Sequence, residues 1–212
     1  MAYDLREKIV FITGGALGIG ALSAKFFLDE GVKHVTVTDV NDSAGKKLES
    51  ELNSKFKGRM KFIKCDVTVD EELFGVYNQI INEFGFIDVV INNAGIMNDS
   101  IYKKAIEVNF LPSNYEGTGV RVITMCYGAT DTSLLSKDKL ASFEREINED
   151  LYNFVHSVPL QRADSAAKSL IEVCKQGESG STWLSKNDLP VEDVTPLDFV
   201  YSIFPVHNLF CT

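Results

Sequence analysis

The stretch Thr13-Gly14-Gly15-Ala16-Leu17-Gly18-Ile19-Gly20 decides the fold of this chain. It follows Ile9-Val10-Phe11-Ile12, a short apolar run typical of a strand that is buried on both faces. After it, apolar residues recur at helical spacing until Gly31, which predicts a helix. A glycine-rich turn between a strand and a helix lets the backbone approach a phosphate at the helix N-terminus, although such turns also occur for packing alone.

The same alternation of strand and helix continues downstream. Further strands are expected at residues 35–39, 61–64, 88–91, 120–125 and 181–184. Further helices are expected around residues 44–52, 73–84, 99–110, 143–154 and 164–174. Four βα units in succession predict an α/β fold with a doubly wound parallel sheet of the Rossmann type and helices on both faces.

The composition fits one cytoplasmic domain. The chain has 212 residues with 21 Lys+Arg against 30 Asp+Glu, so its net charge of −9 argues against nucleic acid or an anionic membrane as partner. No apolar run approaches the ~20 residues that span a bilayer, and the N-terminus does not resemble a signal peptide. Four cysteines without C-x-x-C or metal spacing are expected to be reduced and mostly buried, and no metal site is expected: Cys65, Cys126, Cys174 and Cys211.

The domain boundary is expected late in the chain. Residues 1–184 are predicted to form one nucleotide-binding domain. Residues 185–212 contain Pro190, Pro196 and Pro205 together with several aromatic side chains. That segment is too apolar for a free tail, so we expect an extension packed on the domain.

Asp39 points to the cofactor. It ends the second expected strand, about 20 residues after the glycine turn. A carboxylate there can accept both ribose hydroxyls of an adenosine and repels a 2′-phosphate, and the glycine turn contains no Lys or Arg to attract that phosphate. The sequence therefore predicts NAD rather than NADP.

Several motifs together resemble the classical short-chain dehydrogenase/reductase family. They are the glycine turn, Cys65-Asp66-Val67, Ile91-Asn92-Asn93-Ala94-Gly95, Val108-Asn109 and the stretch from Gly119 to Thr132. The nearest branch is that of the 15-hydroxyprostaglandin dehydrogenase-like enzymes and the related insect alcohol dehydrogenases. The resemblance covers residues 5 to about 184.

The resemblance implies a role for each matching residue. The pyrophosphate turn would be formed by Gly14, Gly15, Leu17, Gly18, Ile19 and Gly20. Asp39 would bind the adenosine ribose. Asp66 and Val67 would flank the adenine, and Asn93 and Gly95 would border the ribose. Thr130 and Thr132 would meet the nicotinamide carboxamide. Asn92 is open to another interpretation, in which its amide ties neighbouring strands together.

The catalytic residues of that family are missing, with one exception. The family uses Asn, Ser, Tyr and Lys, and Asn109 stands where its Asn does. None of the seven tyrosines has a lysine four residues later, so the Tyr-x-x-x-Lys pair is absent. Nine residues, 111–119, replace the strand that ends in Ser and the helix that carries Tyr and Lys. The sequence therefore predicts a fold that is one βα unit shorter, with the deletion near residues 110–113.

This deletion should change the sheet and the surface. We expect Val120–Met125 to pair with Asp88–Ile91, because an empty strand position would leave backbone groups unpaired. The missing helix should leave a helix-sized apolar surface uncovered. The family's main subunit interface uses that helix, so the usual dimer should be lost or altered.

The sequence is compatible with three functions. The family reaction is NAD-dependent oxidation of a secondary alcohol or reduction of a carbonyl, with a small alcohol or ketone, such as a lipid alcohol, as substrate. It would need a surrogate acid/base, for which Tyr127 with Lys103 or Lys104 are the candidates. The second function is a non-catalytic protein that binds NAD weakly or modulates a full-length relative. The third possibility is a truncated product without function.

Overall fold

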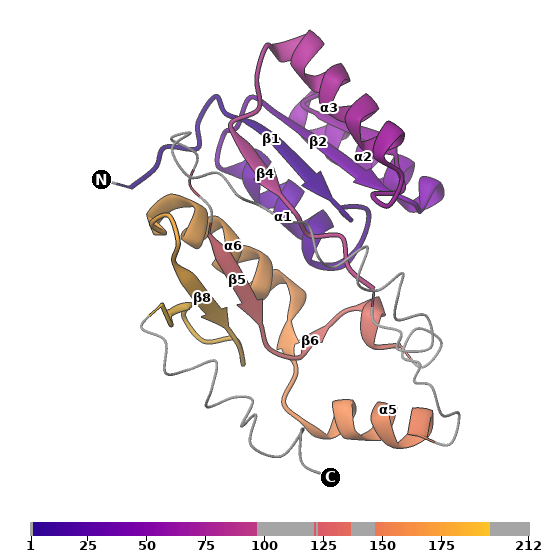
Figure 1. Ribbon diagram of the computed structural model, residues 1–212, viewed down its shortest axis with the longest axis vertical. Helices are drawn as coiled ribbons and strands as arrows, with labels where there is room; N and C mark the ends of the chain where they lie inside the picture. Colours follow the sequence, from indigo (N-terminus) through magenta and orange to yellow (C-terminus); the bar gives the residue numbers. More distant parts are fainter. Residues whose placement is uncertain (1, 97–120, 122, 137–146, 196–212) are drawn as a thin grey trace.

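The first half of the chain forms a parallel sheet of order β3-β2-β1-β4 (Figure 1). The computed structural model describes residues 2–96, 121, 123–136 and 147–195. The strands of this sheet are β1 (Ile9–Thr13), β2 (His34–Asp39), β3 (Met60–Lys64) and β4 (Val89–Ile91). The helices between them are α1 (Gly18–Asp29), α2 (Asp42–Phe56) and α3 (Asp70–Phe84). The predicted α/β fold with a parallel sheet and helices is confirmed.

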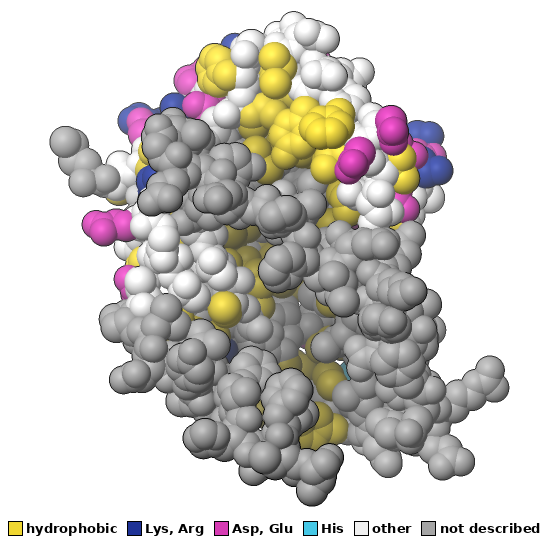
Figure 2. All heavy atoms as spheres, viewed as in Figure 1, with side chains coloured by type: hydrophobic (Ala, Val, Ile, Leu, Met, Phe, Trp, Pro, Cys, Tyr) yellow, Lys and Arg dark blue, Asp and Glu magenta, His cyan; other side chains and the backbone are white. Residues whose placement is uncertain are grey.

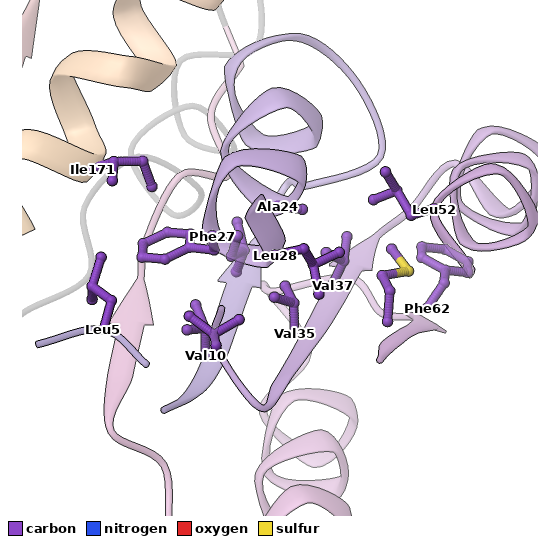
Figure 3. Packing of buried hydrophobic residues seen from close by; sticks show 13 residues of the cluster. Leu5, Val10, Ala24, Phe27, Leu28, Val35, Val37, Leu52, Phe62 and Ile171 are labelled. Atoms are coloured by element: carbon purple, nitrogen blue, oxygen red, sulfur yellow. The ribbon is translucent and has the colours of Figure 1, made fainter. Parts of the chain in front are cut away.

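The sheet is buried on both faces. On β1, Val10 and Ile12 join the core beneath α1 and α2, while Ile9 and Phe11 pack on the other face with residues of α3. Figure 3 shows Phe27 of α1 above the strands, between the sheet and the side chain of Ile171 from α6. Fully burying one such side chain stabilises the fold by about 1.5–3 kcal/mol. The apolar run on β1 is therefore continuous because each face has its own helices to cover it.

The second half is held beside the first by helix packing. It contains α5 (Ile147–Ser157), α6 (Ala163–Gln176) and a 3₁₀ turn, η2 (Ser133–Leu135). Its strands are β5 (Thr124–Tyr127), β6 (Thr130–Asp131), β7 (Gln161–Arg162), β8 (Thr182–Ser185) and β9 (Glu192–Asp193). They form a β5-β8-β9 sheet and a β6-β7 pair. α6 packs against α1, and Ile171 of α6 belongs to the core of the first half (Figure 1).

The expected move of Val120–Met125 to the edge of β4 is wrong. Among the described residues, β4 pairs with β1 alone and β5 pairs in parallel with β8. Arg121 explains part of this outcome, because its guanidinium donates to the carbonyl groups of Gly177 at 2.6 Å and Cys174 at 2.9 Å. The start of β5 is thereby tied to the C-terminal end of α6. A move to β4 would break this anchor and the β5-β8 ladder.

The structure describes two further predicted segments only in part or not at all. The helix expected at 99–110 and residues 196–212 of the proposed extension lie outside the described residues. β8 ends at Ser185, one residue past the proposed domain boundary, and β9 returns antiparallel to it. Of the described cysteines, Cys65 is buried, Cys174 is half-buried and Cys126 is exposed, so the expectation that the cysteines are mostly buried is wrong for Cys126. Within the described part of the chain, no helix is both long and apolar enough to cross a membrane.

An apolar face is exposed on the half that holds α3 and β4. Figure 2 shows hydrophobic side chains gathered there. The exposed apolar residues of these elements and the loop between them are Phe74, Ile81, Phe86 and Val90. On β5, Thr124 and Cys126 are likewise exposed, whereas Met125 and Tyr127 are half-buried. Parallel strands are normally covered on both sides, so these positions mark a face that the described helices leave exposed.

Two helical glycines give a matched test of this packing. A Cβ at Gly45 of α2 would lie 2.1 Å from the ring of Phe62, whereas a Cβ at Gly75 of α3 meets nothing within 4 Å. Gly45→Ala should lower the free energy of unfolding by about 1–3 kcal/mol, because the β3 contact must shift. Gly75→Ala should raise it by about 0.5–1 kcal/mol through helix propensity. Urea unfolding of both variants checks this, and equal effects would contradict the α2-β3 packing.

His34 should make the fold sensitive to acid. It is 7% exposed, its ring lies 4.7 Å from that of Phe84, and its buried Nε2 has no hydrogen-bond partner among the described residues. Burial lowers the pKa of His34, so the unfolded chain takes up this proton at a higher pH than the folded chain. The free energy of unfolding should therefore fall as the pH drops below about 6.5, by up to ~1.4 kcal/mol per pH unit for this proton.

Urea midpoints between pH 5 and pH 8 measure that slope. His34→Leu removes the titrating group at similar volume, so the slope below pH 6.5 should flatten in this variant. An unchanged slope would assign the acid sensitivity to other groups.

Candidate functional site

The candidate site lies where β1, β2 and β4 end. The strands are parallel, so their carboxyl ends meet at one edge of the sheet, where ligands bind in folds of this class. The glycine turn follows β1, Asp39 ends β2, and Asn93 follows β4 by two residues. The structure thus brings together the residues that the sequence predicts for the turn and its two sides.

The turn is packed too closely for side chains at three of its glycines, Gly14, Gly15 and Gly20. A Cβ at Gly14 would lie 2.5 Å from the Cα of Ala94, and Gly14 has a φ of +62°, which also favours glycine. A Cβ at Gly20 would lie 2.6 Å from the Nδ2 of Asn93. These contacts bring the loop after β4 directly against the turn. The sequence did not single out Ala94, although a small residue between Asn93 and Gly95 is the available signal.

The N-terminus of α1 is suited to an anion. Leu17 is the N-cap residue and supplies no side-chain hydrogen bond, and the first turn of α1 contains no acidic residue. The first N–H groups of a helix have no partner within the helix and carry the positive end of its dipole. Gly18 has a φ of +58° and leaves the backbone bare at this point. These features fit a pyrophosphate group, as the sequence predicts.

Asp39 is held beside the turn. Its Oδ2 accepts a hydrogen bond from the N–H of Ala16 at 3.1 Å, and its Oδ1 accepts one from the N–H of Asn41 at 2.9 Å. The residue is half-buried, so its carboxylate is both oriented by the backbone and reachable. A carboxylate oriented in this way, next to an anion-binding turn, can accept ribose hydroxyls.

Asp66 and Val67 lie at the neighbouring strand end. The N–H of Cys65 donates to the carbonyl of Asp39 at 3.1 Å, which places the end of β3 beside the end of β2. Oδ1 of Asp66 accepts hydrogen bonds from the N–H and the hydroxyl of Thr68 at 3.0 and 2.7 Å. Both Asp66 and Val67 are half-buried, as a flank of a planar base would require.

Thr132 reaches the turn from the second half of the chain, whereas Thr130 does not. Thr132 Cγ2 lies 3.4 Å from the Cβ position of Gly18. Thr130 is 7% exposed, and its hydroxyl donates to the carbonyl of Gly128 at 2.8 Å while accepting from Gln161 at 2.9 Å. The side chain of Thr130 is therefore committed to the interior, and Thr132 is the threonine that faces the site. Gln161 was missed because nothing in the sequence marks it.

The strand-tying amide belongs to Asn93 and not to Asn92. Nδ2 of Asn93 donates to the carbonyls of Thr13 at 3.1 Å and Gly14 at 2.8 Å, and the N–H of Asn93 donates to the hydroxyl of Thr13 at 3.1 Å. Asn92 is exposed. Side chains alternate at the end of a strand, so the two neighbouring asparagines take opposite directions. Gly95 is exposed beside them, and Ile19 is half-buried in the first turn of α1.

The acid/base candidates do not assemble among the described residues. Burial raises the pKa of the Tyr127 phenol, which makes it a poorer base at neutral pH. Asn109, Lys103 and Lys104 lie outside the described residues. Burial also raises the pKa of the Cys65 thiol to about 11, so this cysteine is not a nucleophile.

Comparison with known proteins agrees with this geometry. A family model described as short chain dehydrogenase matches residues 8–114. The 15-hydroxyprostaglandin dehydrogenase (NAD(+)) of Bos taurus is 34% identical over 105 residues, which are 49% of this chain and 39% of that protein. The protein of the same name from Homo sapiens is 29% identical over 148 residues, which are 68% of this chain and 55% of that protein. The matched parts thus span between two fifths and just over half of these relatives.

Solved structures show the same fold. A short-chain dehydrogenase/reductase from Brucella melitensis, described as a glucose/ribitol dehydrogenase, superposes with a TM-score of 0.68. The superposition covers 88% of this chain and 98% of that chain, at 16% sequence identity. At this identity, the similarity supports the architecture.

The two asparagines after β4 can be tested against each other. Asn93→Asp replaces an amide donor by a carboxylate that faces two carbonyl oxygens. It should lower the free energy of unfolding by about 1–3 kcal/mol at pH 7. Asn92→Asp places the same charge on the exposed neighbour and should change it by less than about 0.5 kcal/mol. Urea unfolding measures both, and a similar loss in the two variants would refute the Asn93 assignment.

Proposed function

The chain belongs to the short-chain dehydrogenase family, and we propose that it binds NAD but has impaired or no catalysis of alcohol oxidation. The observation that carries the proposal is the carboxylate of Asp39, fixed by the N–H of Ala16 beside an uncapped helix N-terminus. The turn and this N-terminus would hold the pyrophosphate, and Asp39 would accept hydrogen bonds from the adenosine ribose hydroxyls. Relatives whose names specify NAD(+) support the choice of cofactor.

The missing groups limit the chemistry. Bound NAD would supply a hydride acceptor, but alcohol oxidation also needs a base that removes the hydroxyl proton. A phenol serves as that base when a nearby cation lowers its pKa, and the sequence has no lysine four residues after a tyrosine. Burial shifts the pKa of Tyr127 in the opposite direction. We therefore propose binding with impaired or no turnover of a small alcohol or ketone.

A chain that binds NAD in this way could modulate a full-length relative. Exposed apolar residues on α3 and β4, among them Phe74 and Val90, support an altered oligomer interface. A chain that binds NAD but turns over no substrate could modulate such a relative in the cytoplasm by competing for NAD or for subunit contacts. This alternative depends on the same NAD-binding residues, the glycine turn and Asp39.

The cofactor proposal is tested by titration with NADH, followed by nicotinamide fluorescence. We expect saturable NADH binding and much weaker NADPH binding. Asp39→Asn removes the charge that accepts the ribose hydroxyls, so NADH affinity should fall about tenfold and the discrimination against NADPH should narrow. Asp42→Asn is the matched control, because Asp42 pairs with Lys46 on α2, and it should leave both constants unchanged.

Turnover is measured separately, with NAD and secondary alcohols. We expect no NADH formation above the background rate. Absence of NADH binding would overturn the proposed function, and turnover by the wild-type chain would overturn its non-catalytic part.

A further inference from the structure

Gln161 stands out as a fully buried amide whose hydrogen-bonding groups are all used. The residue is 0% exposed. Its Nε2 donates to Thr130 Oγ1 at 2.9 Å and to the carbonyl of Ser185 at 3.0 Å, with the carbonyl of Gly128 at 3.5 Å. Carbonyl oxygens accept only, so they fix which end of the amide is nitrogen. A buried amide in this position is stable only with these partners.

The other end of the amide extends the network into the C-terminal half. Oε1 of Gln161 accepts from the hydroxyl of Ser185 at 3.1 Å, and that hydroxyl lies 3.1 Å from Ser169 Oγ on α6. A serine hydroxyl has one proton, so Ser169 supplies the proton of the second bond. Gln161 therefore connects the end of β8 and, through Ser185, α6 with the segment that contains Thr130.

Within the described part of the chain, the other bonds of this segment, residues 128–132, are mainly between backbone groups. The N–H of Gly128 donates to the carbonyl of Ser185 at 2.8 Å, and β6 pairs with β7 over only two residues. A two-residue ladder is weak by itself. Thr132, at the end of the segment, lies against Gly18 of the glycine turn. The N–H of Gln161 also donates to the carbonyl of Ala129 at 2.8 Å, so the Gln161 amide adds its side-chain bonds to a small set of backbone bonds.

We propose that Gln161 is a positioning residue that fixes residues 128–132 against the glycine turn and so adapts the site to the nicotinamide half of NAD. The inference rests on the proposed function. Asp39 bonds to the turn at Ala16 and marks the adenosine side, while Thr132 contacts the turn at Gly18. A dinucleotide whose pyrophosphate lies at the turn would extend its second half toward Thr132.

Gln161→Met tests this with little change in volume. We expect the variant to bind NADH about three- to tenfold more weakly, because one buried hydrogen-bond network is lost. Binding of ADP-ribose, which lacks the nicotinamide, should stay within about twofold of wild type. Ser169→Ala is the matched control, because it removes only the distal end of the network, and both constants should stay unchanged. Thr130→Val removes one acceptor of Nε2 and should shift the ratio of the two constants in the same direction, which keeps the test valid if Gln161→Met does not fold.

A second measurement needs no cofactor. Hydrogen exchange of the backbone amides of residues 128–132 in the free chain should become about tenfold faster in Gln161→Met, since a local opening then costs less. Amides of β1 should keep their wild-type exchange rates.

The two measurements separate the possible failures. Equal weakening of NADH and ADP-ribose would overturn the positioning role and leave the proposed function standing. A wild-type chain that binds neither ligand would overturn the proposed function and the cofactor part of the inference, and hydrogen exchange then decides whether Gln161 holds the segment. Unchanged exchange at residues 128–132 would overturn the inference.

Discussion

The ends of β1 and β4 meet through bare backbone, and this close approach is the constraint on which the site depends. A side chain at Gly14 would enter the contact distance of Ala94. The amide of Asn93 fills the adjoining space and satisfies the carbonyl groups of Thr13 and Gly14, which lie at the end of the parallel ladder. Together these contacts fix where the glycine turn leaves the sheet, and with it the direction in which the N-terminus of α1 points.

The two halves of the chain are joined by helices, and this explains why β5 does not move to β4. Burying side chains such as Leu170, Ile171 and Val173 of α6 contributes roughly 1.5–3 kcal/mol each. The net contribution of one backbone hydrogen bond to stability is only about 1 kcal/mol. The N–H of Tyr3 adds a bond to the carbonyl of Lys175, and Lys175 pairs with Glu30 at the end of α1. These contacts hold the second half against α1, where β5 pairs with β8.

The part of the fold predicted from the sequence is the part with strong periodicity. The four strands of the first sheet and the helices α1, α2, α3 and α6 lie within a few residues of their predicted positions, because a buried parallel strand needs a continuous apolar run. The two-residue strands β6, β7 and β9 carry no such signal. The glycine turn and Asp39 were predictable from spacing, whereas the direction of Asn93 depends on where β4 ends. Gln161 acts through partners 24 to 33 residues away in the chain, and no local pattern marks it.

Binding and chemistry separate in this fold because different elements supply them. The turn after β1 and the carboxylate at the end of β2 belong to the first half, and residues 128–132 bond to β7 and β8 of the second half. Among the described residues, the packing of α1 against α6 joins the two halves. The resemblance implies that the family's proton-transfer groups come from the βα unit that the sequence lacks. Tyr127 is a poor substitute, since burial raises the pKa of its phenol and no lysine follows it by four residues. Under the proposed function, a dinucleotide would bind at this site without the base that alcohol oxidation requires.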